Sequence, residues 1–149
     1  IEKKSKRTFT SRLYIEVFII AKEREANRDN YVLMGISNGS FLFTESDTYV
    51  FKTTPVELER YRQKGTTDQQ RGEEYEGYIL QITLKDDQGQ THIVTTQTDI
   101  TGKWADNPEL LPKLRDLWTR GRSSKRCRHF NREGAPVDAP RVKHFRVSG

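Results

Sequence analysis

The chain has a single cysteine among its 149 residues, which excludes an internal disulfide and therefore a disulfide-stabilised scaffold. Long hydrophobic runs are also missing. The longest, Val17–Ala21, falls far short of the roughly 20 residues that span a bilayer. Apolar residues make up only 33% of the chain, and charged residues make up 32%. A chain of this length forms about one domain, so the composition predicts one packed domain with solvated extensions.

Sequence signatures of catalysis and metal binding are missing as well. The chain contains no glycine-rich phosphate loop, no G-x-S-x-G and no H-E-x-x-H. Cys127 lies between two arginines that would favour its thiolate, but a nucleophilic cysteine also needs a positioned base and an orienting group. Cys127, His129, His92 and His144 do not have the spacing of a zinc site. We therefore expect a protein that is not an enzyme and has no metal or cofactor.

The acidic residues also have ordinary explanations. Asp86 and Asp87 stand where a turn is expected, and Glu73, Glu74 and Glu76 stand in a polar stretch that we interpret as a solvated loop. Acid–base catalysis by two carboxyls requires that only one of them be desolvated. Neither group of carboxylates is in a context that indicates burial.

The net charge of +5 is distributed unevenly along the chain. Residues 1–12 carry five basic residues and one acidic residue, and residues 120–149 carry nine basic and two acidic residues. The intervening residues 13–119 carry twelve basic and eighteen acidic residues. This pattern predicts an acidic body with two basic ends, divided into an arm at 1–12, a domain at 13–120 and an extension at 121–149.

Hydrophobic periodicity predicts a mostly antiparallel sheet. Residues 13–20 are apolar on both faces, which is typical of a central strand covered on both sides. Asn38-Gly39 between two apolar runs predicts a hairpin with a type I′ turn, joining strands 31–37 and 40–44. A short strand is expected at 48–52, and a second hairpin at 78–97 with its turn at 86–90. A last segment, 141–147, is either an edge strand or extended.

Two helices are expected. In the first, at 54–64, Thr54 is the N-cap, Pro55 is the first helical residue and Gly65 follows the end. In the second, after Asn107 and Pro108, leucines recur on one face up to Gly121, so this helix should pack on the sheet. The predicted fold class is α+β: a mostly antiparallel sheet or small, partly open barrel of about six strands with two helices, the second packed on the sheet.

The segment 120–134 is the strongest functional signal in the sequence. Its cations could neutralise several phosphates, and an aromatic residue among them could stack on an unpaired base. The predicted anion-binding residues, with two more cations from the last segment, are Arg120, Arg122, Lys125, Arg126, Arg128, Phe130, Arg132, Lys143 and Arg146. Trp118 is excluded because its helical spacing places it in the core.

These features favour a non-catalytic binding module for an anionic partner, with nucleic acid ahead of the other partners. An acidic protein, the chain's own acidic body and an anionic membrane surface remain as alternatives. The rival class is a membrane-associated structural or assembly component, since the chain begins at Ile1 and a basic cluster follows at once. The cytoplasm is the favoured compartment, and attachment to a membrane by a preceding anchor is the alternative.

Overall fold

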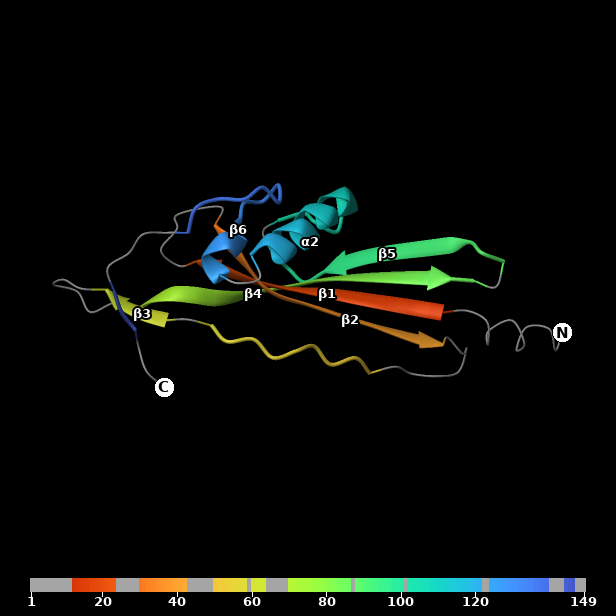
Figure 1. The fold of residues 1–149 in the computed structure, drawn as a ribbon, viewed down its shortest axis with the longest axis horizontal. Coiled ribbons are helices and arrows are strands. Elements are labelled where there is room, and N and C mark those ends of the chain that lie inside the picture. Colours follow the sequence, from red (N-terminus) through yellow and green to blue (C-terminus); the bar gives the residue numbers. More distant parts are fainter. Residues whose placement is uncertain are drawn as a thin grey trace.

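In the computed structural model, an antiparallel sheet carries one α-helix within the residues that the structure describes, which are 12–23, 30–42, 50–58, 60–63, 70–86, 88–100, 102–121, 124–139 and 144–146 (Figure 1). The strands are β1 (Arg12–Glu23), β2 (Tyr31–Leu42), β3 (Arg60–Gln63), β4 (Gln70–Lys85), β5 (Thr91–Gln97), β6 (His129–Phe130) and β7 (His144–Arg146). The helical elements are the 3-10 turn η1 (Pro108–Leu110), the helix α2 (Leu111–Arg120) and the 3-10 turn η2 (Lys125–Arg128).

The sheet is built around β1 and β4, which pair antiparallel along nearly their whole lengths. β2 pairs with the other edge of β1, and β6 continues the sheet beyond the first residues of β2. The outer edge of β4 is shared, because β3 pairs with its start and β5 with its end. β7 in turn pairs with β3. This open, curled antiparallel arrangement confirms the predicted α+β class.

The two faces of the sheet carry separate hydrophobic cores, as the two-sided pattern of β1 predicted. On one face, Phe18 and Ile20 of β1 pack with α2 and with three large aromatic side chains, Tyr31, Trp104 and Phe130. On the other face, Val17 and Ile19 pack with Val32, Met34 and the partly buried Phe51 and Leu58. In Figure 1, α2 therefore lies over one side of the sheet, while residues 50–58 run along the other.

The second predicted helix is confirmed and packs on the sheet. Pro108 opens the 3-10 turn η1, and Pro112 stands in the first turn of α2, so the α-helix begins only at Leu111. Leu111, Leu114 and Leu117 are buried against the sheet. The backbone N–H of Gly121 donates to the carbonyl of Leu117 and ends the helix where the sequence predicted.

The first predicted helix is wrong. Residues 51–58 form no helix, and residues 60–63 form the strand β3; Gly65 lies outside the described residues. Val56, Leu58 and Tyr61 are spaced by two and three residues, so they cannot share one helical face. The segment runs extended instead: Phe51 and Leu58 pack on the second core, and the Thr54 N–H donates to Oγ of Ser37 at 3.0 Å.

The predicted hairpin at Asn38-Gly39 is also wrong. β2 continues through both residues, which pair with Glu16 and Ile15 of β1, and neither has a positive φ. The glycine serves a different purpose here, because a Cβ at Gly39 would lie only 2.8 Å from Cε1 of Phe51. The absence of a side chain lets residues 50–58 cross close over the strand.

Other strand predictions have mixed outcomes. The hairpin β4–β5 is confirmed, with Asp86 Oδ1 accepting hydrogen bonds from the N–H groups of Gln88 and Gln90 in its turn. The strand expected at 48–52 is absent at residues 50–52; the rest of it lies outside the described residues. The predicted solvated loop is wrong from residue 70 onward, because β4 begins there. In the last segment, the edge-strand alternative holds at His144–Arg146.

Candidate functional site

The basic C-terminal segment is integrated into the domain through its residues 124–139. β6 adds Phe130 and His129 to the sheet beside Tyr31 and Val32. The Phe130 ring is fully buried, with its centroid 5.7 Å from those of both Tyr31 and Trp104. Its predicted role in stacking on a base is therefore incompatible with this fold, since a core side chain offers no free ring face.

Lys125 uses its charge inside the molecule. Its Nζ lies 3.1 Å from Oε1 of Glu73, whose side chain is only 4% exposed, while that of Lys125 is 22% exposed. Glu73, expected to be solvated, is therefore buried, and β4 places it under η2. A carboxylate loses much of its hydration when it is buried, so it needs a cation nearby. Lys125 supplies that cation.

Arg128 is likewise held inside the molecule. Its guanidinium carbon lies 4.6 Å from the centroid of the Trp118 ring, a geometry typical of a cation–π contact. Burial lowers the pKa of Arg128, and the negative charge of Glu73 opposes that shift. The Trp118 ring is partly buried against the core, in line with its predicted place there. Arg128 thus contributes to the docking of η2 on α2.

His129 is buried beside these cations. Its Nδ1 lies 2.6 Å from Oδ1 of Asn30. Burial, and after it the positive charges of Arg126, Lys125 and Arg128, lower the pKa of His129 to about 4. The ring is therefore neutral near pH 7. The exposed Cys127 has no hydrogen bond to it, so the two residues do not form a nucleophile–base pair.

Two other cations, Lys113 and Arg120, line a groove between α2 and the C-terminal segment. The groove has a volume of about 530 Å³ and is lined in part by Lys113, Leu117, Arg120 and Cys127. We define the cationic surface as this groove with its lining cations Lys113 and Arg120, together with the exposed Arg126 and Arg132, which lie within two residues in the sequence of the lining residues Cys127 and Gly134. One carboxylate lines the groove as well: Asp116, whose Oδ2 lies 2.7 Å from Nη2 of Arg120.

The structure thus brings together only part of the predicted anion-binding set. Arg120, Arg126 and Arg132 lie on the cationic surface, whereas Lys125 and Arg128 are used internally. Arg122 and Lys143 lie outside the described residues, as does the side chain of Arg146. Lys113 was missed, although its spacing of seven residues from Arg120 on the polar face of α2 is visible in the sequence.

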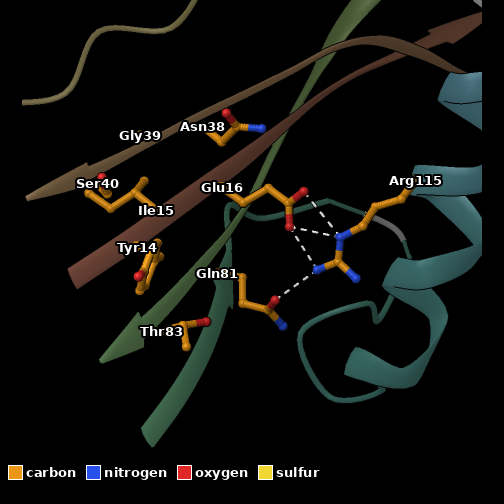
Figure 2. Close-up of a pocket in the computed structure, with 9 residues that line it drawn as sticks. All are labelled: Tyr14, Ile15, Glu16, Asn38, Gly39, Ser40, Gln81, Thr83 and Arg115. Carbon is orange, nitrogen blue, oxygen red and sulfur yellow. Dashed lines mark hydrogen bonds and ion pairs between the residues drawn. The ribbon is translucent and has the colours of Figure 1, made fainter. Parts of the chain in front are cut away.

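A second groove lies on the α2 side of the sheet, beyond the end of the core (Figure 2). It has a volume of about 470 Å³ and is lined by β1, β2, β4 and Arg115 of α2. Arg115 Nε donates to both carboxylate oxygens of Glu16, at 2.9 and 3.1 Å, and Nη2 donates to Oε1 of Glu16 at 2.7 Å and of Gln81 at 2.9 Å.

The ion pair in this second groove has a structural role. It ties α2 to two strands at the point where the core ends, and the Arg115 guanidinium also lies over the Phe18 ring. Because Glu16 neutralises Arg115, the groove offers no net positive charge to an anion. The remaining lining is neutral and comprises Tyr14, Ile15, Asn38, Gly39, Ser40 and Thr83. The cationic surface is therefore the better candidate for an anionic partner.

Other kinds of site are not apparent in the described part of the chain. It contains no group of three or more His, Cys, Asp or Glu side chains placed to hold a metal ion. None of its helices is long and apolar enough to cross a bilayer. Comparison of the chain with protein-family models, with curated proteins and with solved structures finds no match.

Proposed function

We propose that this chain is a non-catalytic binding module for nucleic acid, which it contacts through phosphates at the cationic surface. The supporting observation is that the cations of α2 and the C-terminal segment fall into two groups, one bound within the molecule and one exposed. Lys125 and Arg128 fix the C-terminal segment to the body. Lys113 and Arg120 stay exposed in the lining of one groove, and Arg126, next in the sequence to the lining residue Cys127, is exposed as well. Exposed cations at a rigid groove bind phosphates by displacing counterions, which makes the affinity strongly dependent on salt.

Low base specificity follows from the same residues. Phosphate contacts position a protein on nucleic acid but read no sequence. With Phe130 in the core, the described cationic surface has no aromatic ring available for stacking. We therefore expect similar affinities for oligonucleotides of different sequence.

The test is binding of labelled single- and double-stranded oligonucleotides over a salt series. It uses point variants, since removing residues 120–149 would also remove Phe130 from the core. Arg126→Gln and Lys113→Gln should each weaken binding and reduce the slope of log K against log[salt] by about 0.7–0.9 per lost phosphate contact. The matched control is Lys52→Gln, which makes the same charge change at an exposed lysine of residues 50–58, on the opposite face of the sheet.

Two results would overturn the proposal. One is an affinity that does not change with salt or is unaffected by both variants. The other is binding to anionic vesicles without binding to oligonucleotides, which would assign the cationic surface to a membrane partner.

A further inference from the structure

The strand β5 leaves one backbone edge open. It pairs with β4 over seven consecutive residue pairs without a register shift, and no described element pairs with its other edge. The N–H of Asp86 donates to the carbonyl of Gln90, and that of Thr98 to the carbonyl of Tyr78. Hydrogen-bonded pairs alternate along an antiparallel ladder. Thr91, Ile93 and Thr95 therefore direct their N–H and C=O groups away from β4.

This edge lacks the usual protection against pairing. Natural edge strands carry charges, prolines or bulges, or they are short or covered. β5, with the sequence THIVTTQ, has no lysine, arginine, carboxylate, proline or bulge. In contrast, β6 and β7 are only two and three residues long. Residues 50–58 run beside β2, where the Thr54 N–H donates to Oγ of Ser37.

Two side chains of β5 are apolar and exposed. Ile93 is 58% exposed and Val94 is 61% exposed, and the alternation of a strand puts them on opposite faces of the sheet. A strand laid along the edge would bring side chains beside both residues. Cross-strand pairs of β-branched residues stabilise antiparallel sheets.

We propose that β5 pairs antiparallel with β5 of a second copy of this chain, around a two-fold axis at Ile93. The Gln97 side chain donates to the carbonyl of Gly102 and accepts from the N–H of Ala105, so a loop lies beside the end of β5. The open stretch of the edge is therefore 91–95, which is centred on Ile93. An isologous interface must be self-complementary.

The register around Ile93 satisfies this requirement. Ile93 faces its own counterpart, Thr91 faces Thr95 of the partner subunit, and His92 faces Val94 of the partner subunit. No carboxylate, lysine or arginine stands in the five-residue stretch, so no pair of such like charges meets across the axis. In this register, the outward N–H and C=O groups of Thr91, Ile93 and Thr95 form hydrogen bonds with the same groups of the second copy.

The first experiment measures the mass of the full chain by sedimentation equilibrium over a concentration series. We expect a monomer–dimer equilibrium in the wild type and a dissociation constant at least about tenfold higher in Ile93→Lys, because a lysine at an edge strand opposes pairing. Val50→Lys makes a comparable change at a valine that is 77% exposed and outside the sheet, and it should leave the equilibrium unchanged.

The second experiment tests the register. In a Cys127→Ser background, Ile93→Cys should form an intermolecular disulfide under mild oxidation, because directly opposed residues have Cα atoms about 5.5 Å apart. Val50→Cys in the same background is the control. A wild type that is monomeric at every concentration overturns the proposal. So does a dimer that survives Ile93→Lys, cross-linking of Val50→Cys as fast as of Ile93→Cys, or a monomer that pairs only with a foreign extended peptide.

Discussion

Replacing Glu73 with glutamine tests whether the C-terminal segment is held to the body by an internal ion pair. The carboxylate is 4% exposed and lies 3.1 Å from Nζ of Lys125, which is 22% exposed. Removing one partner of a buried pair costs about 3–5 kcal/mol. Because the Lys125 amine keeps some contact with water, we take the lower end and expect a loss of about 3 kcal/mol in the free energy of unfolding.

Urea denaturation measures this loss directly. In thermal denaturation, a loss of about 3 kcal/mol in a chain of this length corresponds to a fall of roughly 6–12 °C in the melting temperature. The matched control is Glu74→Gln, the same change at the next residue of β4, whose side chain is exposed; we expect a change within about 0.5 kcal/mol. If Glu73→Gln is as stable as Glu74→Gln, Lys125 and Glu73 do not hold η2 to the sheet and our reasoning is refuted.

A double variant separates the pair from its surroundings. Glu73→Leu with Lys125→Met replaces both charges with apolar groups of similar size. We expect it to be more stable than either single variant, because no uncompensated charge stays buried. The coupling energy from this double-mutant cycle should be about 1–3 kcal/mol.

Two further predictions concern pH and packing. The pKa of His129, about 4 in the fold against an ordinary 6.5, means that the unfolded chain binds the proton more tightly. The contribution of the neutral His129 to the free energy of unfolding should therefore be complete above pH 6.5 and should fall by about 2 kcal/mol by pH 5. Urea titration at a series of pH values measures this loss. His129→Gln should abolish it, and the control His92→Gln, at an exposed histidine, should retain it. Gly77→Ala should lower the free energy of unfolding, measured by thermal denaturation, by about 3 kcal/mol, because the added Cβ would lie 2.0 Å from Oγ1 of Thr98. Gly35→Ala, where the nearest atom is at 3.4 Å, should be within about 1 kcal/mol of the wild type.

The parts of the fold that depend on neighbouring residues could be predicted from the sequence. The leucine spacing of α2 and the turn at Asp86 are local patterns, and the structure contains both. The two-sided apolar pattern of β1 also predicted its central place. The hairpin predicted at Asn38-Gly39 was wrong because continuous pairing with β1 and the close approach of Phe51 outweigh the local turn preference of these two residues.

The candidate site was harder to predict, because it depends on contacts between residues that are far apart in the sequence. The concentration of arginines and lysines after residue 119 is plain in the sequence, but which of them stay exposed depends on distant residues. Lys125 is used by Glu73 and Arg128 by Trp118. Phe130 is buried by Tyr31 and Trp104. Charge counting has no means of detecting such contacts, since they form only when the sheet is assembled.

The place of β6 also constrains how the protein is made. His129 bonds Asn30 across 99 residues of chain, and Phe130 completes a core begun by Phe18. During synthesis from the N-terminus, β1 and β2 therefore emerge from the ribosome long before the residues that cover them. Contacts this distant in sequence slow folding and leave apolar surface open in the meantime. Until α2 and β6 have been made, the face of β1 that carries Phe18 and Ile20 lacks its cover, whereas residues 50–58, which pack on the other face, follow β2 closely in the chain.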